Sequence, residues 1–225
     1  MKVHSMWLGC GCLLMAATVS AVPTVSGANE AISIVKTNVA SANGFQLLCV
    51  PVVKLDISGR ATKGNITLAE MFPPASYRGA EVTVLSSSTQ GLAGKIYTVA
   101  AAESDAQWKE NTTLANATEF PAGTTFWLKN GPATSTLFFG GTSGQTIAVP
   151  ASAGMFPIGN AASAAVKIRE ISGTAYDRLL VLAANSNEYV NYTHTGTAWV
   201  KGTSTAVGSD AIAAGEAFFY YKASR

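Results

Sequence analysis

The stretch AIAAGEAFFYYK, residues 211–222, decides the fold because it places four consecutive aromatic side chains, Phe218–Tyr221, directly after a glycine turn. Aromatic residues favour β-strands. Successive side chains of a strand point to opposite faces, so both faces of this strand would be aromatic. The run therefore predicts a strand covered on both faces, either by its own sheet and a neighbouring unit or by another molecule.

The same pattern occurs earlier in the chain. FPAGTTFWLKN at 120–130 also places a small residue, a glycine and two further residues before an aromatic strand. A tryptophan precedes each glycine at nearly the same spacing: Trp108 lies before Gly123, and Trp199 lies before Gly215. The two stretches predict structurally equivalent strands, with the tryptophans, the glycines and Phe126/Phe218 in matching places.

Further matches extend this similarity over most of the chain. MFP occurs at 71–73 and again at 155–157, and KIYTVAAA (95–102) is similar to RLLVLAAN (178–185). AISIVK (31–36) is similar to TSTLFF (134–139). Self-similarity of this kind indicates an internal duplication. We expect two units, unit one at 29–131 and unit two at 132–225.

The secondary-structure signals are strands almost throughout. Short runs of Val, Ile, Thr, Tyr and Phe alternate with Gly, Asn, Ser and Pro. TLAE at 67–70 has capping-box spacing and predicts a short helix; a second short helix is expected within 151–165, and a hairpin at 186–196. The fold class is therefore all-β: two tandem homologous small β-sandwiches or partly open barrels, with at most one or two short helices.

The first residues are typical of an export signal. Lys2 precedes an apolar stretch at 6–19, and small residues follow, which fits a signal peptide over 1–28 cleaved after residue 21 or 28. The apolar stretch is shorter than the ~20 residues that span a bilayer. We expect a protein that is secreted, displayed at the cell surface or held in the periplasm, and that is not integral to the membrane once the signal is removed.

Several of these segments resemble a known family. SGTAYDRLLVLAANS (172–186), the Trp199–Lys201 step, the Gly-x-Ala-Phe-Phe ending at 215–219 and AISIVKTNVASANGFQLLCVPV (31–52) are similar to a family of secreted, functionally uncharacterised proteins expanded in verrucomicrobial bacteria. One departure is Asp177, which stands before Arg178 where that family usually has glycine. The resemblance implies export from a bacterium with a Gram-negative type of envelope, and it implies no activity.

The composition and the polar residues favour no catalytic site. Charged residues make up 12 % of the chain and the formal net charge is +2, without the basic stripe that nucleic-acid binding requires. His194, the only histidine beyond the signal, is expected in solvent at a hairpin tip. Cys49, the only cysteine there, is expected in the core. The acidic residues are scattered, so we expect no catalytic residues, no metal site and no cofactor.

These features favour an exported, non-enzymatic structural or surface protein that assembles with copies of itself into a filament or coat. Its expected assembly strands contain Ile32, Ile34, Val35, Phe218, Phe219, Tyr220 and Tyr221. The alternative is a carbohydrate-binding or adhesive module in which Trp108 and Trp199 stack on the sugars of a surface glycan, although their equivalent places favour packing. A hydrolase is the third reading.

Overall fold

The computed structural model describes most of the chain beyond its first residues: 44–50, 65–102, 104, 106–133, 147–162, 164–183, 188–203 and 207–224, and the backbone of 32–38, 54–55, 61–62 and 136–142. The expected signal peptide lies outside these residues. Strands dominate them, and none of their sheets closes into a barrel. The all-β prediction is confirmed. Within this described part, no helix is long and apolar enough to cross a bilayer.

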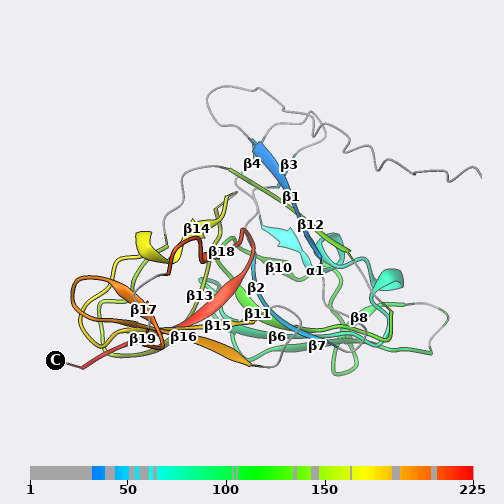
Figure 1. Cartoon of the computed structure of the whole chain (residues 1–225). Coiled ribbons are helices and arrows are strands. Elements are labelled where there is room, and N and C mark those ends of the chain that lie inside the picture. Colours follow the sequence, from blue (N-terminus) through cyan, green and yellow to red (C-terminus); the bar gives the residue numbers. More distant parts are fainter. Residues whose placement is uncertain are drawn as a thin grey trace, which may run out of the picture.

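Two larger antiparallel sheets, drawn to the right and left in Figure 1, form the body of the molecule. The first sheet has the order β2-β11-β6-β7-β8-β9, with strands β2 (Phe45–Cys49), β6 (Glu81–Ser86), β7 (Ile96–Val99), β8 (Trp108–Glu110), β9 (Thr113–Leu114) and β11 (Thr125–Lys129). The second sheet has the order β13-β19-β15-β16-β17, with strands β13 (Gly154–Gly159), β15 (Arg178–Leu182), β16 (Tyr189–His194), β17 (Trp199–Lys201) and β19 (Ala217–Lys222).

The two sheets share their connectivity and their turns. In each, the last strand in sequence (β11 or β19) lies between an earlier edge strand and the first strand of a meander. The third strand of that meander carries the tryptophan, Trp108 on β8 or Trp199 on β17. The glycine before this last strand has positive φ in both, +84° at Gly123 and +76° at Gly215. Gly123 N–H donates to Val50 O at 2.8 Å, as Gly215 N–H does to Asn160 O at 2.9 Å.

The helical turns are short, as expected, but only one lies where the sequence predicts it. Helix α1 (Leu68–Met71) is capped by Thr67, whose hydroxyl accepts from the N–H of Glu70 while the Glu70 carboxylate accepts from the N–H of Thr67. This is a capping box. The helix expected within 151–165 is wrong, because β13 occupies 154–159. A 3₁₀ turn, η2 (Ile168–Glu170), follows instead.

Smaller strand pairs complete the described structure. Strands β5 (Ile66–Thr67) and β10 (Glu119–Phe120) pair beside the first sheet, and β14 (Val166–Lys167) and β18 (Ala211–Ile212) pair beside the second. Further pairs join β3 (Lys54–Leu55) to β4 (Ala61–Thr62) and β1 (Ile32–Asn38) to β12 (Thr136–Thr142). The last pair forms a ribbon above the two sheets in Figure 1. It joins strands from the two expected units.

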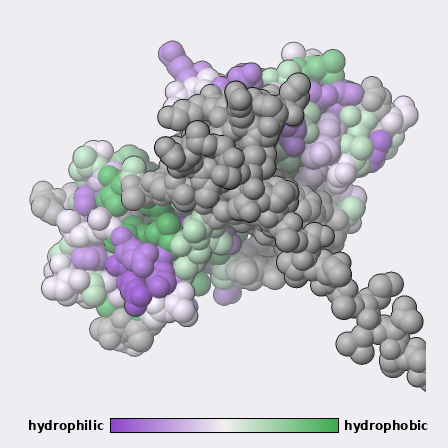
Figure 2. Space-filling model, turned by 90° about the horizontal axis from the view of Figure 1, so that it is seen from above, coloured by the Kyte–Doolittle hydropathy of each residue, from purple (hydrophilic) through white to green (hydrophobic). Residues whose placement is uncertain are grey.

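Each large sheet buries one face in its own hydrophobic core. The first core includes Phe72, Val82, Trp108, Phe120 and Phe126, and the second includes Ile168, Leu179, Trp199, Phe218 and Tyr220. Seen from above, the described atoms that are visible lie on either side of the atoms drawn in grey (Figure 2). The two sheets thus carry separate cores, and what joins them is a third cluster of side chains.

Candidate functional site

The aromatic run 218–221 lies in β19, and the two alternate side chains nearest the core are fully buried. Phe218 and Tyr220 are both 0 % exposed and pack in the second core. Tyr220 also contacts Trp199 edge-on, with ring centroids 6.2 Å apart. One face of this strand is therefore covered by its own unit.

The other face of β19 meets the first sheet. The ring of Phe219 lies 6.4 Å from that of Trp127 on β11 and 6.1 Å from that of Tyr189 on β16. Trp127 follows Phe126 as Phe219 follows Phe218, so equivalent positions of the two sheets contact each other. Tyr221 lies next to Arg178, whose guanidinium carbon is 6.0 Å from the ring centroid. The second face is thus covered partly by the neighbouring unit, through Trp127, and partly by its own unit, through Tyr189 and Arg178.

These contacts describe how Phe218–Tyr221 lie within their own chain, and their expected role as an assembly strand stays a prediction. Strand β19 pairs along its full length with β13 and over 219–221 with β15. Over 219–221 both edges of β19 are therefore hydrogen-bonded within the chain, and these three residues offer no backbone edge to another chain. For Ile32, Ile34 and Val35 the described backbone lies in β1, which pairs with β12 of the same chain.

The paired tryptophans are core residues. Trp108 is 0 % exposed and Trp199 is 2 % exposed. Each indole N–H donates to a backbone carbonyl just after a short helical turn: Trp108 to Phe72 O and Trp199 to Ile171 O, both at 2.7 Å. Stacking on a sugar needs an accessible ring face. The interpretation of these two residues as glycan-stacking platforms is therefore incompatible with their burial.

The junction cluster is the set of apolar side chains at which the two sheets meet: Leu47, Cys49, Leu85, Trp127, Ala161, Leu182, Ala217 and Phe219. Backbone contacts support it, since Cys49 N–H donates to Gly215 O at 2.8 Å and Leu48 forms an isolated bridge with Glu216. A Cβ atom added at Gly159 would overlap the Cβ and Sγ atoms of Cys49. The two sheets are therefore in direct contact at this point.

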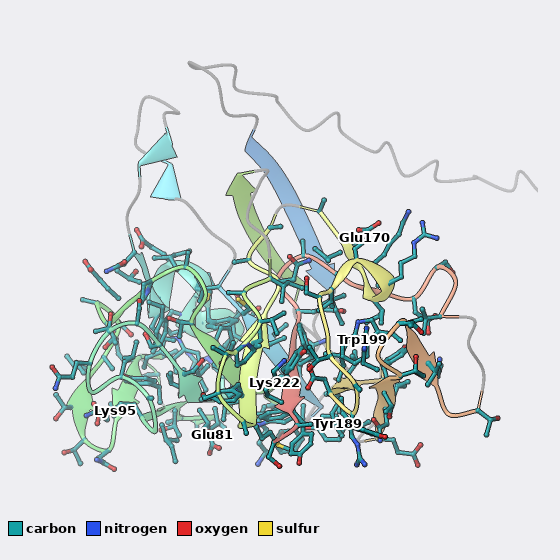
Figure 3. The ribbon with its side chains drawn as sticks, turned by 90° about the vertical axis from the view of Figure 1, so that its left-hand side faces the viewer. Glu81, Lys95, Glu170, Tyr189, Trp199 and Lys222 are labelled. Atoms are coloured by element: carbon teal, nitrogen blue, oxygen red, sulfur yellow. The ribbon has the colours of Figure 1, made fainter. Side chains whose placement is uncertain are left out.

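Beside this cluster lies the junction groove, a cavity of about 330 Å³ lined by Phe45, Glu81, Thr83, Trp127, Lys129, Leu182 and Tyr189. The first five come from the first sheet and the last two from the second. Figure 3 shows Glu81 and Tyr189 at the same lower edge of the molecule. The groove thus opens where the two sheets meet.

The strand registers explain why these side chains share one face. Phe126 and Leu128 point into the first core, so alternation places Trp127 and Lys129 on the opposite face. Lys129 lies opposite Phe45 on β2 and opposite Glu81 on β6, and its Nζ is 5.9 Å from the Phe45 ring centroid. A cationic group and a carboxylate therefore lie beside an exposed aromatic ring.

The aromatic walls of the groove are accessible. Phe45 is 44 % exposed and Tyr189 is 39 % exposed, while Trp127 is half-buried between them. Partial burial raises the pKa of the Tyr189 phenol, and its hydroxyl can donate and accept hydrogen bonds. Sequence reasoning missed the groove. The alternation in TFWLK (125–129) marks Trp127 and Lys129 as outward-facing, but Tyr189 joins them only through tertiary structure.

A buried polar cluster distinguishes the second sheet from the first. Asp177 is 0 % exposed, and Oδ2 accepts from the Tyr220 hydroxyl at 2.7 Å and from Lys222 Nζ at 3.0 Å. Thr174 N–H also donates to Oδ2, at 2.8 Å, and Ala223 N–H donates to Oδ1 at 3.0 Å. Burial opposes ionisation, but these hydrogen bonds outweigh it and hold the pKa of Asp177 well below its usual range. The cluster fixes the C-terminal end of β19.

His194 is not the solvated tip residue that the sequence suggests. The segment 189–194 is strand β16, and His194 is 7 % exposed, with its ring 4.9 Å from that of Trp199. Burial lowers the pKa of its imidazole. Cys49 is 0 % exposed, and burial raises the pKa of its thiol to about 12. Neither side chain has the exposure expected of a nucleophile or a general base that meets a substrate.

Among the described residues, no group of three or more His, Cys, Asp or Glu side chains lies close enough to hold a metal ion. Comparisons of the chain with protein-family models, curated proteins and solved structures found no match. The junction groove is therefore the candidate functional site on the basis of its own geometry.

Proposed function

We propose that the protein is an exported, non-enzymatic adhesive module that binds its ligand in the junction groove. The observation that carries this proposal is an accessible groove whose walls combine aromatic rings with Glu81, Thr83 and Lys129. Binding sites in proteins are typically concave, mostly apolar and supplied with a few polar groups that fix orientation. Export remains an expectation from the first 28 residues.

A binding role suits the groove better than a hydrolytic one. Glu81 is the only carboxylate among the residues that line it, whereas glycoside hydrolysis usually employs a pair. The buried Asp177 is held by donors from its own unit and lies in the second sheet's polar cluster. What the groove offers a ligand is aromatic surface and hydrogen-bonding groups.

The test is co-sedimentation of the purified mature protein with isolated bacterial envelopes. We compare the wild type with Tyr189→Ala, which removes one wall of the groove, and with Tyr176→Ala as a matched control. Tyr176 is 75 % exposed and does not line the groove. We expect saturable sedimentation that is lost in Tyr189→Ala and retained in Tyr176→Ala. Equal sedimentation of all three proteins would refute binding through the groove.

Self-assembly is a second candidate, favoured by the ribbon of β1 and β12. Among the described strands each pairs only with the other, over seven residues. A two-stranded sheet is marginally stable alone, and open edges are templates for pairing with another chain. Light scattering at high concentration tests this, with deletion of residues 22–38 as the variant. We expect assemblies that the deletion abolishes; a monomeric wild type would exclude assembly.

A further inference from the structure

We infer that the junction groove selects an uncharged hexopyranose chain, bound with sugar rings lying against Trp127 and Tyr189. This inference rests on the proposed binding function and names the ligand class. It follows from three features of the groove: the two-sided placement of its rings, the balance of its charges, and its size.

The rings line the groove from both sheets. Phe45 and Trp127 come from the first sheet and Tyr189 from the second, and all three have exposed surface. Tyr and Trp suit interfaces that are apolar on one side and wet on the other. A hexopyranose has this dual character, because its ring C–H groups form an apolar face and its hydroxyl groups form a polar edge. A sugar ring can therefore cover an aromatic wall while keeping its hydroxyls near polar partners.

The polar side chains of the groove are placed to hydrogen-bond the hydroxyl edge of a sugar ring. Lys129 and Glu81 are directly opposite each other on neighbouring strands, and Thr83 lies opposite Trp127. Together these side chains offer an ammonium donor, a carboxylate acceptor and a hydroxyl that can do both. Sugar hydroxyls can bond to all three. An alkyl chain would leave the two charged groups without hydrogen bonds, which is unfavourable when a ligand displaces their water.

The two charges also set the preference for an uncharged ligand. Glu81 would repel a polyuronate that Lys129 attracts, and Lys129 would repel a glucosamine polymer that Glu81 attracts, so neither charged polymer gains a net electrostatic attraction. Like charges brought together in an interface oppose binding. A quaternary ammonium ligand would benefit from the rings, but Lys129 lies 5.9 Å from the centre of the Phe45 ring and repels a second cation. Neutral sugars avoid both repulsions.

The size fits a short stretch of a glycan. The volume of about 330 Å³ corresponds to about eleven waters at about 30 Å³ each, which is the space of one or two sugar rings. The groove is open to solvent at the lower edge of the molecule (Figure 3). A longer glycan can therefore bind through a few of its sugar rings while both of its ends extend into solvent. An open groove of this kind suits an internal segment of a polysaccharide.

Trp127 provides the readout. Of the three tryptophans beyond the expected signal peptide, Trp108 and Trp199 are buried, whereas Trp127 lines the groove. Acrylamide quenching of the full mature protein therefore reports mainly on Trp127. We titrate neutral gluco-, manno- and N-acetylglucosamine oligosaccharides, with oligogalacturonate, chitosan oligomers, tetramethylammonium and dodecanoate as the other arms.

We expect at least one neutral hexose oligosaccharide to protect Trp127 saturably, with affinity reduced about tenfold or more in Tyr189→Ala and in Phe45→Ala, as for an aromatic anchor. Tyr176→Ala should bind as the wild type does. Glu81→Gln should improve oligogalacturonate binding relative to the wild type, because it removes the repelling carboxylate and keeps the side-chain shape.

The outcomes separate this inference from the proposed function. Envelope binding that depends on Tyr189 but survives periodate oxidation of the envelope glycans, with no oligosaccharide protecting Trp127, would overturn the glycan inference and leave the binding function standing. Protection only by tetramethylammonium, by dodecanoate or by a charged oligomer would overturn it as well. Failure of envelope binding to respond to Tyr189→Ala refutes the proposed function itself.

Discussion

Replacing Asp177 by alanine should be among the most destabilising single changes in the second sheet. The carboxylate is fully buried and joins three parts of the chain: the turn at Thr174, strand β19 through Tyr220 and Lys222, and Ala223 just after that strand. Its removal leaves the Lys222 ammonium, with 13 % side-chain exposure, without its counter-charge at 3.0 Å.

The expected loss is about 3–5 kcal/mol in the free energy of unfolding, the range found when one partner of a buried ion pair is removed. Much of that loss comes from the stranded Lys222. The double variant Asp177→Ala/Lys222→Met should therefore be more stable than Asp177→Ala alone, with a coupling energy of about 1–3 kcal/mol. Alanine itself is compatible with the backbone at this position, as the equivalent position of the first sheet shows. Ala80 occupies the corresponding place, its carbonyl accepting from Val99 N–H as that of Asp177 accepts from His194 N–H.

The pH dependence provides a second signature of the Asp177 cluster. The folded-state pKa of Asp177 is depressed, so its contribution to stability is present above the unfolded carboxyl value of about 3.9 and is lost as the pH falls from there toward the folded-state pKa. The wild type should therefore lose stability on acidification more steeply than Asp177→Ala/Lys222→Met. Urea unfolding followed by tryptophan fluorescence, at pH 7 and in steps below pH 5, measures both effects. A double variant no more stable than Asp177→Ala would refute the reasoning.

Three further predictions concern the junction and the backbone. Gly159→Ala should cost about 1–3 kcal/mol by overpacking, because its new Cβ overlaps Cys49; with Cys49→Gly added, the total loss in urea unfolding should be smaller than the sum of the single losses. Tyr176→Gly should raise the free energy of unfolding by about 0.5–1 kcal/mol, since Tyr176 has φ 70° and is mostly exposed; a lower urea midpoint than that of the wild type would contradict this. The Cys49 thiol should resist a disulfide reagent at pH 8 in the native protein and react fully in urea, because burial raises its pKa to about 12; rapid native reaction would show that it is accessible.

The strand content and the short capped helix could be predicted from the sequence because they depend on local signals. Thr67 and Glu70 lie close together in the chain, and their spacing alone predicts the capping box that the structure contains. Aromatic strands after a positive-φ glycine are similarly local, so FPAGTTFWLKN and IAAGEAFFYYK indicated β11 and β19. Nothing further along the chain was needed to predict these elements.

Matches that depended on letters alone placed other segments wrongly. MFP at 71–73 lies at the end of α1 and just after it, whereas MFP at 155–157 lies in β13. RLLVLAAN was matched with 95–102, but β15 pairs with β19 as β6 pairs with β11, so its counterpart is β6 and not β7. Short apolar strands are interchangeable in sequence, and hydrogen-bond partners distinguish them. Those partners lie far away along the chain.

The junction groove was beyond sequence reasoning for a related reason, which also explains its asymmetry. The two sheets meet through equivalent residues, Trp127 and Phe219, so a wall on one side of the junction would be expected to have a counterpart on the other. Strand β16 extends to Tyr189, opposite Leu182. In the first sheet Tyr97 takes the place of Tyr192, since each lies opposite a buried residue of the preceding strand. Tyr189 lies three residues before Tyr192, and the residue three before Tyr97 is Gly94, which has no side chain and a φ of +86°. The aromatic wall thus depends on the extra length of β16, which has six residues where its counterpart β7 has four, and a ligand in the groove should bind once per chain despite the shared architecture.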